Sequence, residues 1–288
     1  LDFSIYHKNI YTVEGQVVYS YNKGMSRNDN GMYYFTFKRA PDAGLSCGLN
    51  YIRVGNNVDV KTGYVYQKNT QSTDVFTGYS WRFKKKRIKK LYVNIDGNLS
   101  TDCSNMITSK GISFISSIDF RNKSSITSSC YLSRSKYQVY QGSDLVWTDY
   151  FFPYNGFSFR YYYNSGGFIK GYNLDLTYNQ EGVYQDDYTR VENGYSYQVS
   201  AGTTIRPKEN MEILCKVGHT SQFTSEKSHL IFRGTTYSIS TQYQLSKDWF
   251  VSADYKGQSR FKQYNFNCVL GYNWGAGNIL QIIYKRRR

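Results

Sequence analysis

The chain has 288 residues, a formal net charge of +15 and an aromatic content of 18%, including 31 tyrosines. It contains no run of about 18 or more apolar residues, which excludes a helical membrane span within this sequence. Three prolines in the whole chain and the absence of a Gly- or Pro-rich linker predict one continuous domain over residues 1–288.

Alternation of apolar and polar residues, which is the period of a β-strand, begins near the N-terminus and recurs along the chain. The 3.6-residue period of a helix is hard to find anywhere, so the chain is predicted to be all-β. In chain order, the predicted strands cover residues 1–9, 12–22, 32–39, 44–54, 57–67, 73–85, 89–100, 111–121, 125–140, 156–164, 167–179, 194–206, 210–220, 228–245, 249–257, 263–274 and 278–286.

The last third of the chain shows the alternation most clearly. Over 263–274, large apolar side chains occupy every second position: Tyr264, Phe266, Cys268, Leu270, Tyr272 and Trp274. Amides and glycine occupy most positions between them. Because successive side chains of a strand point to opposite faces, one face is aromatic and the other is polar. This two-sidedness is typical of strands that meet lipid on one face and a wet lumen on the other.

The fold class that follows is a transmembrane, antiparallel, up-and-down β-barrel of about 16–18 strands. A membrane demands closure, because unpaired edge groups cannot be hydrated in hydrocarbon. The predicted strands number about 17, whereas single-chain bacterial barrels almost always have an even number. The sequence therefore leaves three alternatives open. The chain has one strand more than this count, two of the counted segments form a single strand, or one strand of the barrel lies outside this chain.

Charged residues at polar-face positions are the candidates for lining the lumen. Acidic and basic side chains nearly balance there, which suits a lumen bridged by ion pairs and acting as an electrostatic filter. Lys170 and Arg134 fall instead on the apolar face, where we expect them near its edges. The lumen-lining candidates are Asp59, Lys61, Asp96, Asp119, Arg121, Arg160, Asp175, Glu212, Lys216, Asp254 and Lys256.

The positive excess is concentrated at strand ends, and its largest cluster surrounds one turn. One interpretation is a solvated rim. The other is electrostatic contact with lipid phosphates or an acidic partner, because basic clusters beside a membrane are attracted to anionic headgroups. This candidate membrane-rim cluster consists of Lys84, Lys85, Lys86, Arg87, Lys89 and Lys90.

Several function classes are disfavoured. The near balance of charge on the polar face argues against a nucleic-acid partner. No recognised motif surrounds the three histidines, and no Cys-x-x-Cys or phosphate-loop motif is present, so we expect no enzyme activity, cofactor or metal.

Two regions resemble a known family. The segments 243–255 (YQLSKDWFVSADY), 269–274 (VLGYNW) and 277–281 (GNILQ) are similar to outer-membrane β-barrels that follow a family 9-like carbohydrate-binding module. The segments 48–51 (GLNY) and 57–64 (NVDVKTGY) are similar to the same barrels. The module itself is absent from this chain. The resemblance implies the outer membrane of a Gram-negative bacterium, and a chain that is the C-terminal portion of a larger barrel.

Two functional hypotheses follow, with outer-membrane lipid, lipopolysaccharide and other envelope proteins as expected partners. The first is a pore for polar solutes, or a barrel subunit of a larger outer-membrane complex. The second is a plugged, surface-anchored scaffold whose loops, predicted at 141–155 and 179–193, recruit a partner or a glycan. Aromatic residues near the first loop, including Tyr150 and Tyr154, could form a stacking platform for sugar. A soluble β-solenoid or capsid-like protein is the third alternative.

Overall fold

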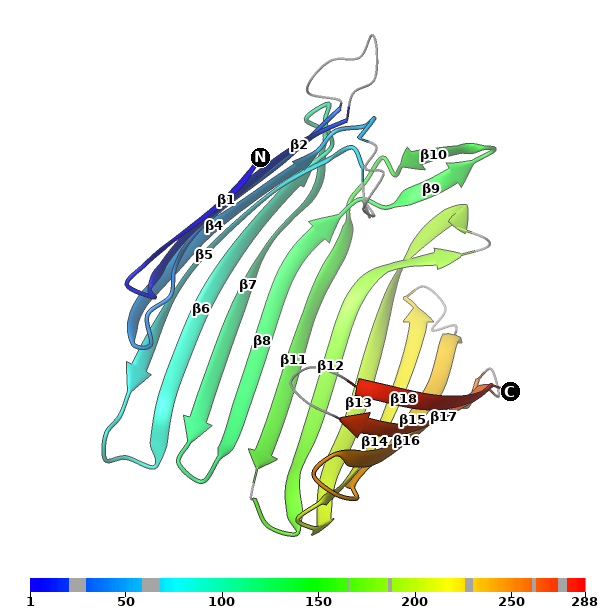
Figure 1. Cartoon of the computed structure of the whole chain (residues 1–288). Helices are drawn as coiled ribbons and strands as arrows, with labels where there is room; N and C mark the ends of the chain where they lie inside the picture. The colour runs from blue at the N-terminus through cyan, green and yellow to red at the C-terminus, as the bar shows by residue number, and fades with distance from the viewer. Residues whose placement is uncertain are drawn as a thin grey trace. The chain divides into compact units, whose positions relative to one another are not determined.

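The computed structural model describes residues 1–20, 30–58, 68–164, 166–185, 188–225, 230–260, 263–273 and 279–287. The described residues form β-strands and no α-helix (Figure 1), so none of them builds a helix able to cross a membrane. The strands are β1 (Asp2–His7), β2 (Tyr11–Tyr19), β3 (Gly31–Arg39), β4 (Gly44–Val54), β5 (Thr70–Arg82), β6 (Ile88–Thr101), β7 (Ile107–Phe120), β8 (Ser124–Ser135), β9 (Gln138–Gln141), β10 (Asp144–Trp147), β11 (Phe152–Asn164), β12 (Ile169–Gln185), β13 (Arg190–Lys208), β14 (Met211–Thr224), β15 (Leu230–Gln244), β16 (Trp249–Gln258), β17 (Gln263–Asn273) and β18 (Ile279–Arg287).

Sixteen of these strands form one sheet in which each strand lies beside its neighbours in sequence. The order runs from β1 through β8 and then from β11 to β18, while β9 and β10 pair only with each other. The pairings whose register is defined are antiparallel, for example β1 with β2 and β17 with β18. The structure thus confirms the all-β class and the up-and-down topology, and its strand number is one of those predicted.

The predicted closure into a barrel is not confirmed. The sheet begins at β1 and ends at β18, and no pairing among the described residues joins these two strands. Alternation along a sequence fixes which face each side chain occupies. It does not fix the tilt and stagger that must agree around a barrel before its first strand meets its last.

Some predicted boundaries are also corrected. The single strand predicted at 125–140 is divided into β8 and β9. The predicted loop 141–155 contains β10 and the start of β11, and most of the predicted loop 179–193 is strand in β12 and β13. Residues 59–67, which make up most of another predicted strand, lie outside the described residues.

The chain divides into two compact units, each with contributions from several strands. Unit 1 comprises Leu1–Ile118, Ser128–Phe157 and Gln180–Asn193, and unit 2 comprises Asp119–Thr127, Ser158–Asn179 and Gly194–Arg288. Strands β7, β8, β11, β12 and β13 pass from one unit to the other.

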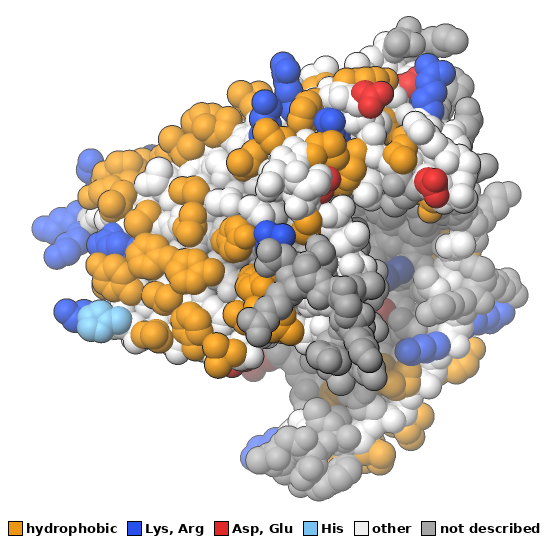
Figure 2. All heavy atoms as spheres, turned by 90° about the horizontal axis from the view of Figure 1, so that it is seen from above, with side chains coloured by type: hydrophobic (Ala, Val, Ile, Leu, Met, Phe, Trp, Pro, Cys, Tyr) orange, Lys and Arg blue, Asp and Glu red, His pale blue; other side chains and the backbone are white. Residues whose placement is uncertain are grey.

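In each unit the apolar face of the sheet is open. Leu45, Tyr79 and Val93 form a row across β4, β5 and β6 in unit 1 and are 49%, 42% and 39% exposed. In unit 2, Val217 and Ile239 are 50% and 48% exposed. Figure 2 shows hydrophobic side chains spread over an outward-facing surface. No second layer of the described residues covers these rows, unlike in a soluble β-sandwich, where two sheets share one interior.

A small apolar core lies away from this face, in unit 1. Val139, Phe152 and Val191 are its buried members, and Tyr137, Val146 and Tyr184 pack against them. These residues come from the β9–β10 hairpin, its two flanks and the facing ends of β12 and β13. We call this cluster the loop cap. It fixes the hairpin on the strand ends, where the two predicted loops lie.

Candidate functional site

The polar face of unit 1 contains a cavity of about 370 Å³. Its floor is a cross-strand row in which Asn50 of β4 is paired with Asp74 of β5, and Asp74 with Asn98 of β6. Strands β7, β8 and β11 complete the wall with serine and tyrosine side chains. The alternation predicted from sequence therefore places amides, carboxylates and hydroxyls together on one side of six strands.

Asp96 is the lumen-lining candidate that this cavity contains. Its carboxylate accepts hydrogen bonds from Asn94 Nδ2 at 2.6 Å and from Ser113 Oγ at 3.1 Å. Asp96 also lines a neighbouring cavity of about 600 Å³, together with Glu14 and Lys38. The two cavities share Asn50, Phe76 and Asp96, so the hydrophilic surface of unit 1 extends from β1 to β11.

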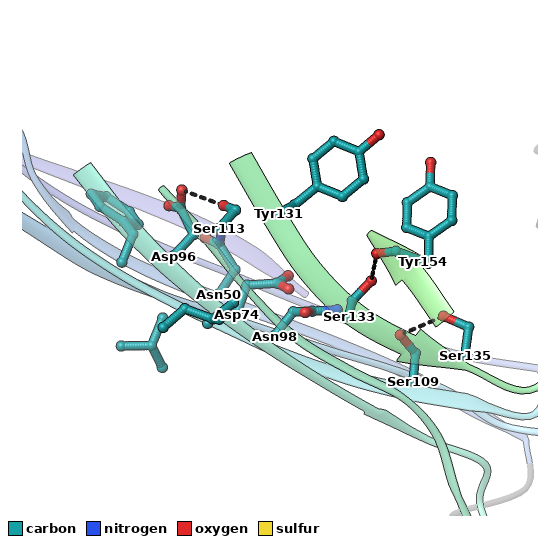
Figure 3. A pocket seen from close by; sticks show the side chains of 14 residues that line it. Asn50, Asp74, Asp96, Asn98, Ser109, Ser113, Tyr131, Ser133, Ser135 and Tyr154 are labelled. Carbon is teal, nitrogen blue, oxygen red and sulfur yellow. Dashed lines mark hydrogen bonds between the residues drawn. The ribbon is translucent and has the colours of Figure 1, made fainter. Parts of the chain in front are cut away.

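Two tyrosines stand on the same side of the sheet as these carboxylates (Figure 3). The rings of Tyr131 and Tyr154 are stacked, with centroids 5.3 Å apart and an interplanar angle of 27°. Below them, Ser133 Oγ donates a hydrogen bond to the backbone oxygen of Tyr154 at 2.7 Å. Sequence reasoning had placed Tyr154 in an aromatic loop and had missed Tyr131. The missed signal is parity, because Tyr131 falls with Ser133 and Ser135 on the polar positions of β8.

The polar face of unit 2 carries ion pairs instead. Arg160 of β11 binds Asp175 of β12, and Asn173 Nδ2 donates to the same carboxylate at 2.9 Å. Glu212 of β14 binds both Lys170 and Arg206 Nη2, the latter at 2.6 Å. The sequence analysis expected Lys170 near an edge of the apolar face, and the structure adds that its amine reaches a carboxylate of the polar face. Lys170 stands at the start of β12, where its long stem can turn toward a carboxylate despite the parity of its Cα.

A second part of this face, in unit 2, is basic. Lys216 and Lys256 lie on either side of Ser238 in the register of β14, β15 and β16, beside a cavity of about 380 Å³. Asp254 stands two residues before Lys256 on β16, opposite Ser240 and Asn267. Neither lysine forms an ion pair with the described residues.

The structure thus separates the predicted lumen-lining residues into groups. Asp96 belongs to unit 1, and the Arg160–Asp175 pair, Glu212 and the Lys216–Lys256 groove belong to unit 2. Asp119 lies near the end of β7, and Arg121 is an exposed residue of the turn that follows. Asp59 and Lys61 lie outside the described residues.

The membrane-rim cluster occupies the connection between β5 and β6. Lys84, Lys85, Lys86 and Arg87 are exposed in this connection, and Lys89 and Lys90 lie at the start of β6. Two of the lysines are held over aromatic rings: Lys86 Nζ is 5.2 Å from the centroid of Phe83, and Lys90 Nζ is 5.8 Å from that of Tyr92. The basic cluster therefore lies directly beside aromatic side chains.

Aromatic side chains also mark both ends of the apolar face within each unit. One end of the strands carries the β5–β6 connection in unit 1 and the β15–β16 connection in unit 2. At this end, Tyr79 packs against Trp81 in unit 1 and Trp249 packs against Tyr272 in unit 2, each pair at 4.6 Å between centroids. At the other end of the strands, Tyr19 meets Tyr33 in unit 1, and Tyr255 meets Tyr264 in unit 2.

The distance between these aromatic ends can be followed along single strands. Tyr11 and Tyr19 of β2 are spaced as Tyr264 and Tyr272 of β17 are, which at ~3.3 Å per residue is about 26 Å along the strand. With a strand tilt of ~40°, this corresponds to about 20 Å, which is close to the ~25 Å apolar band of outer-membrane barrels.

No protein-family model matches the chain, and no curated protein matches it significantly.

Proposed function

We propose that this chain is an outer-membrane β-sheet protein whose polar face lines a path for polar solutes, either as a pore by itself or as a barrel subunit of a larger outer-membrane complex. The observation that carries the proposal is the exposed apolar face in both units, bounded at each end by aromatic side chains. A large exposed apolar surface needs a partner, and the aromatic spacing matches that of a bilayer.

The polar face supports the second half of the proposal. Its carboxylates, lysines and arginines are of mixed sign, and many are held by neighbours in fixed positions. Such side chains around an aqueous path select solutes by charge and hydrogen bonding without any chemical step. The cavity of unit 1 is lined by carboxylates, and the groove of unit 2 is lined by lysines, so each unit carries its own charge on the polar face.

Closure is part of this proposal. In hydrocarbon, each unpaired backbone group of an edge strand costs several kcal/mol, of order 2–7 kcal/mol by transfer measurements. An up-and-down sheet with an even number of strands has antiparallel first and last strands, so β1 and β18 have the relative direction that pairing requires.

The decisive experiment compares two neighbouring positions on β16. Ala253 lies between Thr241 and Cys268 in the middle of the apolar face. Ser252, the residue directly before it, lies on the polar face. We expect Ala253→Arg to destabilise the membrane-inserted protein by about 2–4 kcal/mol, because lipid-facing arginine is costly near the midplane, and Ser252→Arg to have little effect. Stability is measured by guanidinium unfolding in lipid vesicles.

Equal effects of the two substitutions would contradict the membrane assignment, since an apolar face in water accepts arginine readily. Partition of the wild-type chain into buffer in the absence of detergent would contradict it as well, and would favour the soluble alternative. Stable conductance steps in a planar bilayer support the pore.

The scaffold hypothesis keeps one specific observation in its favour. The loop cap is an ordered structure rather than a free loop, with Phe152 only 2% exposed. Tyr150 and Tyr188, on its periphery, are 64% and 60% exposed and offer a contact surface. Inserted protein that never conducts would favour this plugged scaffold over the pore.

A further inference from the structure

The stacked tyrosines in the cavity of unit 1 lie on the polar face of the sheet, as do Phe76 in the same cavity and Tyr34 in the neighbouring one. Tyr131 and Tyr154 differ from these residues in that their rings stack on each other at the edge of the cavity. Tyr131 and Tyr154 lie on the polar face, above a surface of carboxylates, amides and hydroxyls (Figure 3). Tyr154 is 38% exposed, so part of the pair remains open to a ligand.

The hydrogen-bonding groups around the pair point into the same space. Asp74 and Asn98 are paired across β5 and β6, and Asp96 reaches the cavity from the next position on that face of β6. Ser135 Oγ donates to Ser109 Oγ at 3.1 Å, which orders the hydroxyls below the rings. The cavity volume, about 370 Å³, falls within the range of small-molecule sites, which is roughly 300–1,000 Å³.

This combination matches the chemistry of a sugar ring. A pyranose has an apolar face of C–H groups and a rim of hydroxyls that both donate and accept hydrogen bonds. An aromatic ring packs against the apolar face. Ionised carboxylates accept from the rim hydroxyls, and amide groups accept and donate. A flat apolar platform beside fixed acceptors therefore fits a sugar better than a small inorganic ion.

The charge of the cavity narrows the class of sugar. Asp74 and Asp96 line it, and no lysine or arginine does among the described residues. Phosphorylated, sulfated and carboxylated sugars would be repelled, as would nucleotides, whose phosphates need basic partners. The described residues also contain no group of His, Cys, Asp and Glu side chains that could hold a metal ion.

We propose that the cavity around Tyr131 and Tyr154 is a binding subsite for uncharged oligosaccharides. The proposal rests on the proposed function, in which this face lines the solute path, and it names the solute class. Affinity is weak, with Kd in the millimolar range, because only one ring stacks and the cavity remains open to water; this corresponds to about 4 kcal/mol.

The test is calorimetric titration of the full chain in detergent with uncharged tetrasaccharides built from glucose, galactose or N-acetylglucosamine. We expect at least one to bind, and Tyr131→Ala to weaken its binding tenfold or more. Tyr131→Phe keeps the ring and should remain within about threefold of wild type, a difference of less than about 1 kcal/mol. Tyr34→Ala is the matched control, because Tyr34 lines the neighbouring cavity and not this one.

The outcomes separate the two proposals. If the protein inserts and conducts but binds none of the sugars, the subsite is refuted and the pore stands. If it binds sugar through Tyr131 but stays in buffer without detergent, the membrane proposal fails and the subsite stands. Equal losses in Tyr131→Ala and Tyr34→Ala, or tighter binding of a sulfated analogue, would overturn the subsite. Circular dichroism of each variant confirms that the sheet is formed.

Discussion

Tyr137 is a tyrosine of the loop cap that packs against its buried core. Its ring packs edge-on against Phe152 and Tyr184, and the Gly182 N–H donates a hydrogen bond to its hydroxyl oxygen at 3.2 Å. Burial in the loop cap raises the pKa of Tyr137 to about 12, and nearby Glu181 contributes in the same direction. The neutral phenol is therefore the form that the folded cap favours.

The consequence is an alkaline transition of the loop cap. The pKa of Tyr137 in the folded protein lies above the usual value of about 10. The neutral phenol therefore stabilises the folded loop cap fully below pH 10, and this contribution to stability is lost as the pH rises toward 12. We expect the difference between wild-type and Tyr137→Phe absorbance at 295 nm to titrate near pH 12. A difference that titrates near pH 10 would show that this phenol is solvated.

Glycine at position 48 is required by a close approach between strands. A Cβ there would lie 2.7 Å from the Phe37 backbone oxygen and 2.3 Å from Cε1 of Phe76, its cross-strand partner. We expect Gly48→Ala to lower the free energy of unfolding by about 1–3 kcal/mol, because a backbone oxygen cannot move aside. Gly97→Ala is the control, since nothing lies within 4 Å of its Cβ position. That variant should be unchanged or more stable by about 0.5–1 kcal/mol.

At the scale of the element, the β5–β6 connection joins a basic cluster to an aromatic strand end. Lysines beside an anionic membrane surface gain about 1 kcal/mol each. We expect the double substitution Lys84→Gln with Lys85→Gln to reduce flotation with anionic vesicles about tenfold at low salt, and to leave zwitterionic vesicles unaffected.

The matched control for this prediction removes two lysines of the same unit that lie at the opposite end of the strands from the β5–β6 connection. Lys110 and Lys136 both lie over the ring of Phe151, at 5.6 and 5.5 Å from its centroid. If Lys110→Gln with Lys136→Gln lowers anionic binding equally, net charge rather than the membrane-rim cluster determines the affinity. The cluster would then be a solvated rim.

Individual strands were predictable because alternation is a local property. The predicted segment 249–257 corresponds to β16, and 44–54 to β4, with matching faces. Predictions failed where tertiary contacts decide. The hairpin of β9 and β10 leaves the sheet because its apolar residues bury themselves against Phe152 and Val191. The amine of Lys170 turns toward the polar face because the Glu212 carboxylate is within its reach. Parity assigns Tyr131 to the polar face, but only the tertiary structure brings its ring against that of Tyr154.

For the whole molecule, the architecture depends on whether the two end strands of the sheet, β1 and β18, pair with each other. We expect β1 and β18 to pair within one chain in lipid. In a variant without its five cysteines, single cysteines at Phe3, Ser4 or Ile5 are combined with cysteines at Ile282, Ile283 or Tyr284. At least one combination should form a disulfide within the monomer, as should the neighbouring positive control at Thr241 and Ala253.

Disulfides formed only between two chains would show that the ends pair in an assembly, which supports the subunit form of the proposal over the single-chain pore. A positive control that forms while every β1–β18 combination stays reduced would mean that this chain does not close by itself, and strands from elsewhere would have to cover its ends.

The sequence alone determined that this protein is made of antiparallel strands with one apolar and one polar face, because side-chain direction in a strand depends only on position parity. It also located the basic turn, since charge clusters are local. The tertiary structure alone decided that no second layer of the described residues covers the apolar face, that two tyrosines meet above a cavity, and that the sheet ends at β1 and β18. Each of these depends on contacts between residues distant in sequence, which parity does not encode.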